Sequence, residues 1–250
     1  MPHFDDYQPL ASYGPTENLA CRETVFDSDV TDDQLRASSR LASQLTRAWP
    51  GFQLVLLMND GQRGRGVSFW QNQQTLDNYI HRHQGDLHDH VASHEPDNPW
   101  LTSVTSRRSG VVDMYLTGAS MPAANREVVS WYPPGAVRIS EIRQLEDLET
   151  LRNWWPMIAS PTAPRSLVQV HGFQFFAAVL YPDNVYVTYL GFRNQDDLDA
   201  YLASGLHSAH DGPFESTEFR AKLEIVTSTG RLLAWFMRDV EVSGFTQGEA

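Results

Sequence analysis

Five of the nine histidines in this chain are clustered between residues 81 and 94. Histidine gains and loses a proton near neutral pH, so such a cluster is a candidate for general acid-base catalysis. If residues 74–94 form a helix, then His83, His90 and His94 fall on the apolar stripe that faces the core. Because a buried imidazole needs a polar partner, we predict that at least one of these three contacts a substrate and transfers a proton.

Two other interpretations of the histidine cluster stay open. The helix can fray after Gly85, which would leave the histidines in water. His90 and His94 have the i,i+4 spacing that metal ligands use. No third ligand is apparent in the sequence, so we predict no metal site.

Large aromatic side chains near the histidines can hold a flat ring system by stacking. Trp70 and Tyr115 lie on expected strands that would line a pocket, and Tyr79 and Trp100 add aromatic surface beside them. Packing in the hydrophobic core is the alternative for each of the four. We predict that they bind the substrate.

Polar side chains complete the candidate site. Asn72 directly follows an expected strand and could orient a phenol or an oxyanion, although its counterpart Asn194 favours a helix cap for both. His171 opens an expected strand, where it could face the substrate or be a hydrogen-bonded core residue; it is also a candidate axial ligand if the protein binds haem. We predict that Arg107 and Arg108 are a solvated pair rather than a substrate or haem clamp.

The elements that position these residues occur twice along the chain. Residues 72–89, NQQTLDNYIHRHQGDLHD, align without a gap with residues 194–211, NQDDLDAYLASGLHSAHD, and the preceding aromatics Trp70 and Phe192 also match. The identical pairs are Asn72/Asn194, Gln73/Gln195, Leu76/Leu198, Asp77/Asp199, Tyr79/Tyr201, His88/His210 and Asp89/Asp211. Self-similarity at a constant offset indicates two copies of one small domain. Four of the five clustered histidines have no counterpart in the second copy, so we expect the active pocket in the first.

Each copy has the predicted order β-α-β-β-α-β of a ferredoxin-like sandwich, so the fold class is α+β. The expected strands are 19–26, 52–58, 64–70 and 111–116 in the first copy, and 136–142, 168–181, 185–192 and 223–226 with 232–236 in the second. The expected helices are 31–49, 74–94, 146–155 and 195–202. We predict that the apolar faces of the two sheets pack together into one barrel-like β core with helices outside. The predicted divisions are an N-terminal arm at 1–18, repeats at 19–129 and 130–242, and a tail at 243–250.

Composition and motifs argue against several classes of protein. The net charge is −12 without a visible basic patch, which argues against nucleic-acid binding. No apolar run is long enough to cross a membrane, and the acidic start lacks the features of a secretory signal. Cys21 is the only cysteine, and no G-x-G-x-x-G dinucleotide motif is present. We expect a cytoplasmic protein, with no membrane association, that binds a small hydrophobic molecule.

The segments VSFWQNQQTLDNYI and TYLGFRNQDDLDAYL each carry a strand that ends in a large aromatic and a polar helix start. They resemble the dimeric α/β-barrel (ferredoxin-like) superfamily, and the first resembles its antibiotic biosynthesis monooxygenase branch. Most members are single units that dimerise. A fused pair of this size is similar to the ring-opening oxygenases of aromatic polyketide (angucycline) pathways, and also to the haem-binding chlorite dismutase group.

The resemblance implies an oxygenase in antibiotic biosynthesis that acts on a hydrophobic polycyclic aromatic polyketide. The reaction would be hydroxylation or oxidative C–C cleavage of a phenol or hydroquinone by O2. It implies either no tightly bound cofactor or reduced flavin, FMNH2 or FADH2, as a co-substrate from a separate flavin reductase. The alternatives are a haem-binding chlorite-dismutase-like protein and a non-catalytic small-molecule-binding barrel. A homodimer is compatible with each.

Overall fold

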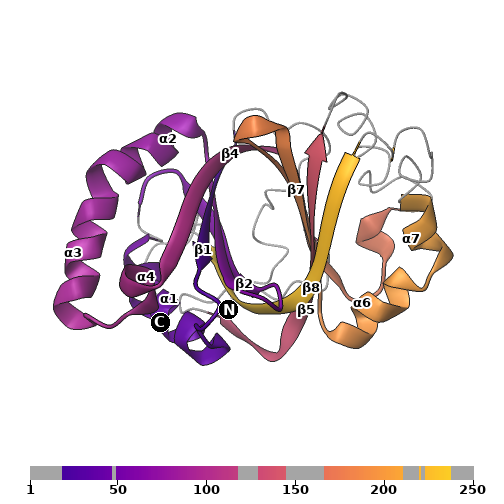
Figure 1. Cartoon of the computed structure of the whole chain (residues 1–250), viewed down its shortest axis with the longest axis horizontal. Coiled ribbons are helices and arrows are strands. Elements are labelled where there is room, and N and C mark those ends of the chain that lie inside the picture. Colours follow the sequence, from indigo (N-terminus) through magenta and orange to yellow (C-terminus); the bar gives the residue numbers. More distant parts are fainter. Residues whose placement is uncertain are drawn as a thin grey trace, which may run out of the picture.

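The computed structural model describes residues 19–46, 49–117, 129–144, 166–210, 220 and 223–237. Within these ranges, eight strands close into one antiparallel barrel, and helices cover it on two opposite sides (Figure 1). The strands are β1 (Ala20–Phe26), β2 (Phe52–Asn59), β3 (Gly64–Trp70), β4 (Val104–Thr117), β5 (Val129–Gln144), β6 (Phe173–Tyr181), β7 (Val185–Phe192) and β8 (Leu223–Met237). The helices are α1 (Asp32–Thr46), α2 (Gln73–Asn78), α3 (Gln84–His94), α4 (Pro99–Thr102), α6 (Gln195–Leu202) and α7 (Gly205–His210). Shorter turns are the π-helical η2 (Tyr79–His83) and the 3-10 turns η3 (Leu167–Gln169) and η4 (Pro182–Asn184).

The barrel consists of two ferredoxin-like sheets joined at their edges. The strand order around it is β1-β3-β2-β8-β5-β7-β6-β4, which contains the units β4-β1-β3-β2 and β8-β5-β7-β6. The last strand of each unit pairs with the other unit, β8 with β2 and β4 with β6. Closure removes the free sheet edges that each unit would expose alone. The predicted α+β fold, with two ferredoxin-like units in one barrel-like core and helices outside, is confirmed.

The two units place corresponding residues at corresponding positions. Trp70 ends β3 and pairs with Phe52 on β2, while Phe192 ends β7 and pairs with Phe173 on β6. A register shift follows Phe52 and Phe173 in both units. The paired rings meet edge to face in both, with centroids 5.4 Å apart in the first unit and 6.1 Å apart in the second. Trp70 and Phe192 therefore occupy matching places, as the internal alignment predicts.

Alternation along the strands separates an inner core from an outer layer. On β2, Leu54, Leu56 and Met58 pack inside the barrel, whereas Val55 and Leu57 belong to clusters on the outer face. The helices of each unit pack over this outer face. Each unit therefore has a layer between sheet and helices in which side chains can enclose a ligand.

Several boundaries differ from the predicted ones. β4 begins at Val104 rather than at residue 111, and β6 begins at Phe173 because η3 occupies the start of the expected strand. β8 is one continuous strand, since its length lets it pair with β2 and β5 together. The expected helix at 146–155, the arm at 1–18 and the tail at 243–250 lie outside the described residues. In the described residues, no helix is long and apolar enough to cross a membrane.

Candidate functional site

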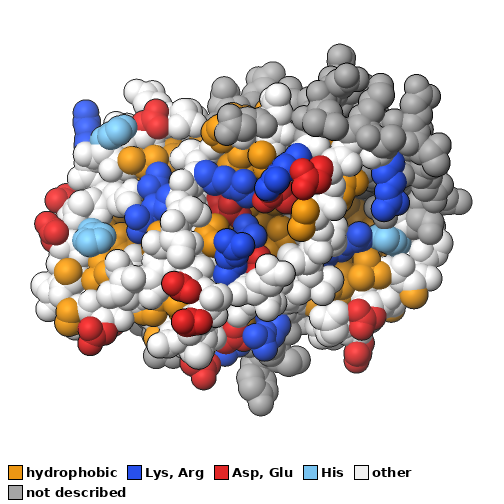
Figure 2. Space-filling view, viewed as in Figure 1, with side chains coloured by type: hydrophobic (Ala, Val, Ile, Leu, Met, Phe, Trp, Pro, Cys, Tyr) orange, Lys and Arg blue, Asp and Glu red, His pale blue; other side chains and the backbone are white. Residues whose placement is uncertain are grey.

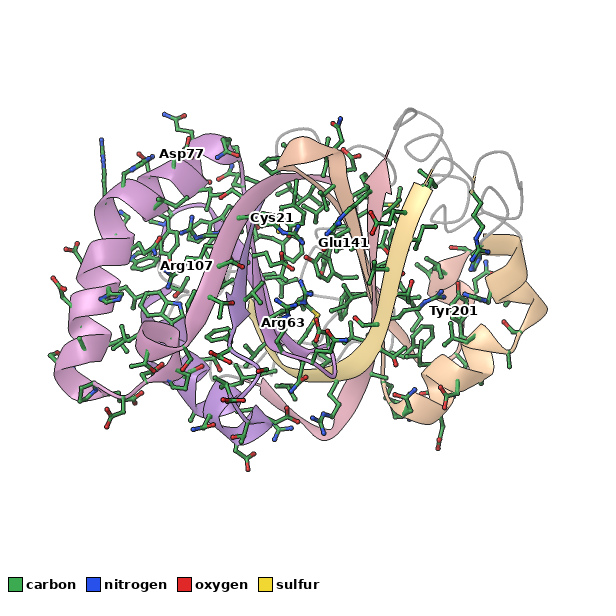
Figure 3. All side chains as sticks on the ribbon, viewed as in Figure 1. Cys21, Arg63, Asp77, Arg107, Glu141 and Tyr201 are labelled. Atoms are coloured by element: carbon green, nitrogen blue, oxygen red, sulfur yellow. The ribbon has the colours of Figure 1, made fainter. Side chains whose placement is uncertain are left out.

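Two cavities lie between the barrel and its helices, one in each unit. The first cavity has a volume of about 90 Å³ and the second of about 340 Å³. Residues that line the first include Arg22, Trp70, Tyr79, Gln84, Trp100 and Arg107. Residues that line the second include Arg138, Ser140, Thr188, Tyr201, His207 and His210. Figure 3 shows Arg107 between the barrel and the helices α2 and α3, and Tyr201 on the opposite side, next to α6 and α7. Small-molecule sites usually measure about 300–1,000 Å³, so only the second reaches that range.

A stacked aromatic pair borders each cavity; both rings line the first, whereas in the second Tyr201 lines the space and Phe192 does not. Trp70 at the end of β3 stacks on Tyr79 with ring centroids 4.6 Å apart. Phe192 at the end of β7 stacks on Tyr201 with centroids 5.2 Å apart. A helix begins just after each strand, and the asparagine before it, Asn72 or Asn194, caps it by accepting a backbone N–H. This short connection brings the tyrosine of the helix over the aromatic of the strand.

An arginine reaches into each cavity from the outer face of the first strand of its unit. Arg22 on β1 pairs with Ser68 on β3, and Arg138 on β5 pairs with Leu190 on β7, so the two arginines occupy corresponding positions. Arg22 Nη2 donates to Gln84 Oε1 at 2.9 Å. Arg138 donates to His207 Nε2.

The first cavity holds a second guanidinium. Arg107 of β4 lies with its guanidinium carbon 5.6 Å from the Trp100 ring centroid. In the described part of the chain, neither Arg22 nor Arg107 forms an ion pair with a carboxylate. Burial lowers the pKa of both arginines, and it raises the pKa of Tyr79 to about 12. Tyr79 is therefore a neutral hydrogen-bonding group at physiological pH.

The second cavity contains two histidines whose ring nitrogens are engaged. Because arginine only donates, His207 accepts from Arg138 through Nε2, so that nitrogen carries no proton. Tyr201 Oη and His210 Nδ1 lie 2.7 Å apart. The ring of His207 also meets the ring of Tyr201 edge to face. Arg220 also lines this cavity, which thus combines two cations, a neutral base and the aromatic ring of Tyr201.

Both cavities have the opposite charge character to the protein as a whole. The chain has 31 acidic and 19 basic residues other than histidine. No aspartate or glutamate is among the described residues that line either cavity. Cationic walls in an acidic protein favour ligands that carry or develop negative charge, such as phenolates.

The prediction that His83, His90 and His94 face the core is wrong for His94, which is exposed. His83 is half-buried and stacks against Trp49, and His90 is half-buried and lies beside His94. The π-helical turn η2 adds a residue to the helix and rotates everything after it, so Gln84 rather than His83 reaches Arg22. None of the three histidines lines either cavity. The described residues hold no group of three or more His, Cys, Asp or Glu arranged for a metal ion.

The structure brings only some of the predicted substrate-binding residues together. Trp70, Tyr79 and Trp100 line the first cavity. Tyr115 lies inside the barrel, fully buried against Phe69, so it contacts neither cavity. The capping role of Asn72, which its counterpart Asn194 favoured, is confirmed.

His171 does not open a strand, contrary to the prediction. It lies in the turn before β6, its side chain is 81% exposed, and it contacts Arg193 and Asp197. Gly172, which follows it with a φ of +75°, turns the chain into β6 and leaves His171 outside. No haem could therefore be held in either cavity through this residue.

The barrel interior contains a buried charge network that the sequence did not suggest. Glu23 is fully buried and accepts hydrogen bonds from Arg65 at 2.7 Å, from Tyr189 at 2.9 Å and from Arg108. Arg108 also lies 4.1 Å above the Tyr181 ring, so the prediction of a solvated pair is wrong for this residue. The Cys21 thiol is buried and hydrogen-bonded to Tyr181. The effect of burial exceeds that of the hydrogen bond and raises the pKa of the thiol, which disfavours the reactive thiolate.

Figure 2 shows basic and acidic side chains gathered over the centre of the face that looks down the barrel. Arg65 also donates to Asp60 at 2.7 Å, and Arg108 to Glu141 at 3.3 Å, so each arginine bridges the buried carboxylate to a second one. The described polar groups of this network satisfy one another. We therefore regard the network as part of the scaffold and the two outer cavities as the candidate sites.

Comparison with known proteins reveals similarity in structure but not in sequence. No protein-family profile and no curated protein matches the chain. An anthrone oxidase-like protein of known structure aligns with a TM-score of 0.55 and 13% identity over 95% of this chain and 100% of its own. A candidate monooxygenase from Lactobacillus acidophilus aligns with a TM-score of 0.57 and 10% identity over 89% and 97%.

A second candidate monooxygenase, from Fusobacterium nucleatum, aligns with a TM-score of 0.58 and 7% identity over 89% of this chain and 95% of its own. The chain has the dimeric α/β-barrel fold. In this dimeric α/β barrel, both units belong to one polypeptide, and the alignments extend across both. At such low identity the comparison establishes the fold, and function has to be argued from the cavities.

Haem needs an axial ligand that faces a cavity wide enough for the macrocycle. In this dimeric α/β barrel, the described histidines that line a cavity are His207 and His210, and each is engaged by a neighbour, Arg138 and Tyr201. His171, the predicted ligand, lies at the surface. The predicted ligand His171 therefore does not fit, because it lies outside both cavities, and no reaction step is assigned to haem.

Proposed function

We propose that the protein is an oxygenase that acts on a hydrophobic polycyclic phenol or hydroquinone in the second cavity. The observation that carries the proposal is the Arg138–His207 pair, which faces a 340 Å³ cavity whose wall includes the ring of Tyr201. A substrate that supplies its own electrons to O2 needs a base for its phenolic proton and a cation for the resulting oxyanion. The pair supplies both.

The second cavity supports this chemistry better than the first, where the sequence had led us to expect the active pocket. Its volume lies in the range of ligand sites, whereas 90 Å³ is too small for fused rings. The group that accepts from the arginine is an imidazole in the second unit and an amide, Gln84, in the first. An amide cannot take a proton near neutral pH, so of the described residues that accept from the two arginines only His207 can act as a general base.

The proposed reaction starts with the substrate ring against the ring of Tyr201. The phenolic O–H of the substrate replaces the Arg138 N–H at Nε2 of His207, whose single lone pair then takes the proton. The guanidinium of Arg138, released from the imidazole, donates its N–H groups to the phenolate oxygen and holds it. The surrounding walls exclude water, which strengthens this ion pair.

Electrons then pass from the electron-rich ring to O2, and a C–O bond forms at the activated carbon. For an anthrone-type substrate, the CH2 group becomes a carbonyl, and its two hydrogens leave with the second oxygen atom as water. The substrate supplies all the electrons, so this reaction balances without a cofactor. Hydroxylation of a fully oxidised ring, or C–C cleavage that inserts one oxygen atom and releases the other as water, would require two electrons from reduced flavin supplied by a separate reductase.

Oxygen uptake tests the proposal. We expect the purified protein to consume O2 stoichiometrically with anthrone and to produce anthraquinone in the absence of flavin, measured with an oxygen electrode and by absorbance. Turnover only when FMNH2 or FADH2 is supplied would assign the flavin-dependent reaction instead. Binding of anthrone without O2 uptake in either condition would contradict the proposal and indicate a non-catalytic binding barrel.

Aromatic polyketides of antibiotic pathways are the natural source of such phenols, and we propose this class as the substrate. Its support is the similarity of the fold to an anthrone oxidase-like protein and the size of the second cavity. We also infer that the two units arose by copying one ancestral unit, because Trp70 and Phe192, like Arg22 and Arg138, occupy matching register positions. A cytoplasmic location and a homodimer remain part of the proposal.

A further inference from the structure

The first cavity keeps the arginine of the second but not its base. Arg22 and Arg138 occupy corresponding strand positions, and each donates to a side chain of the helix above it. In the second unit that partner is His207, which can take a proton; in the first it is Gln84, which cannot. A ligand in the first cavity can therefore be bound through the arginine without being deprotonated there.

Two guanidiniums share the first cavity without a carboxylate. Arg22 is half-buried, Arg107 lines the same space but is exposed at its edge, and in the described ranges neither has an acidic partner. A like charge beside the half-buried Arg22 raises its free energy, a cost that a bound anion offsets. Both arginines have lowered pKa values through burial, which is consistent with an unmet need for negative charge.

The walls and volume of the first cavity restrict the anion. Trp70, Tyr79 and Trp100 provide flat apolar surface, and the guanidinium forks match the planar oxygen pair of a carboxylate. A volume of about 90 Å³ excludes fused ring systems. An apolar protein cavity of about 150 Å³ holds benzene, so this one encloses at most part of a single ring, and the rest of the ring would lie at the opening beside the exposed Arg107.

We propose that the first cavity is a separate site that binds a small planar carboxylate, at most one ring in size, without transforming it. Arg22 and Arg107 bind the carboxylate, and the aromatic residues contact its apolar part. This site is independent of the proposed oxygenase reaction, because it uses none of the residues of the second cavity. Its ligand is a different molecule from the polycyclic substrate.

Calorimetric titration with benzoate as the probe tests this site. We expect one benzoate to bind per chain, with affinity that falls as salt is added, and no binding of the neutral benzyl alcohol. Acetate in a parallel titration distinguishes the contributions, because equal affinity for acetate would show that the aromatic walls are not used. No binding of either carboxylate at millimolar concentration would overturn the proposal.

Gln84→Glu is the decisive variant, because it places a carboxylate of nearly the same shape beside Arg22. We expect the affinity for benzoate to fall at least tenfold while the melting temperature stays the same or rises. Arg22→Gln should also lower the affinity at least tenfold, and Arg63→Gln, at an exposed arginine outside both cavities, should leave it unchanged. If Arg138→Gln abolished binding and Gln84→Glu did not, benzoate would occupy the second cavity and the proposal would be wrong.

Discussion

His207→Gln is expected to lower kcat by about 10²–10⁴-fold while leaving KM within a small factor of its original value. Glutamine keeps an acceptor for Arg138, so the guanidinium stays in place and the cavity keeps its shape. Glutamine cannot take the phenolic proton, so the substitution slows the chemical step and leaves substrate binding unchanged. Steady-state oxygen uptake over a range of anthrone concentrations measures both constants.

Arg138→Gln and His90→Gln separate this effect from general damage. Arg138→Gln removes the cation that holds the phenolate, so it should lower kcat as well, with a pH profile shifted toward higher pH because the substrate must ionise unaided. His90 belongs to the histidine cluster on the opposite side of the barrel and lines neither cavity. If His90→Gln lowered kcat and His207→Gln did not, catalysis would belong to the first unit.

Glu23→Ala is expected to lower the free energy of unfolding by about 3–5 kcal/mol, the cost of removing one partner from a buried ion pair. Glu23 has no exposed surface and accepts from two arginines and a tyrosine. Its loss leaves two positive charges facing each other inside the barrel, with only Asp60 and Glu141 at their far ends. Urea denaturation followed by circular dichroism measures the change.

Glu141→Ala provides the matched comparison. Glu141 pairs with the same Arg108, but its side chain retains 22% of its exposure and water can replace it. We expect a loss of about 1 kcal/mol or less, as for other solvent-accessible ion pairs. Equal losses for Glu23→Ala and Glu141→Ala would mean that the network is solvated and does not act as a buried unit.

The fold was predictable because two signals in the sequence agree. The constant offset between residues 72–89 and 194–211 reveals two copies, and nearly continuous apolar runs such as residues 173–181 indicate strands that bury both faces. Together they require two sheets that share a core. The strand order that follows from a ferredoxin-like unit is the order observed.

The site was less predictable because its position depends on details that periodicity does not carry. A helical projection assumes a constant angle per residue, and the π-helical turn at Tyr79–His83 breaks that assumption. The histidines after it rotate outward, and Gln84 takes the inward position. The second copy contains fewer histidines than the first. Its His207 nevertheless contacts an arginine in a cavity large enough for a small-molecule ligand.

Arginine and glutamate within strands gave no usable signal. Arg22 and Arg138 alternate with apolar residues as any outward polar residue would, and their equivalence becomes visible only through strand register. Glu23 follows the same β1 alternation but points inward, where a charge is expected only with partners from distant strands. Those partners, Arg65 and Arg108, are far away in sequence.

The structure of the complex with anthraquinone, the expected product, is the most direct measurement of where the chemistry takes place. The account predicts the ring system in the second cavity, stacked on Tyr201, with one carbonyl oxygen within hydrogen-bonding distance of Arg138. Anthraquinone bound against Tyr79 and Trp100 in the first cavity, with the second one empty, would contradict it.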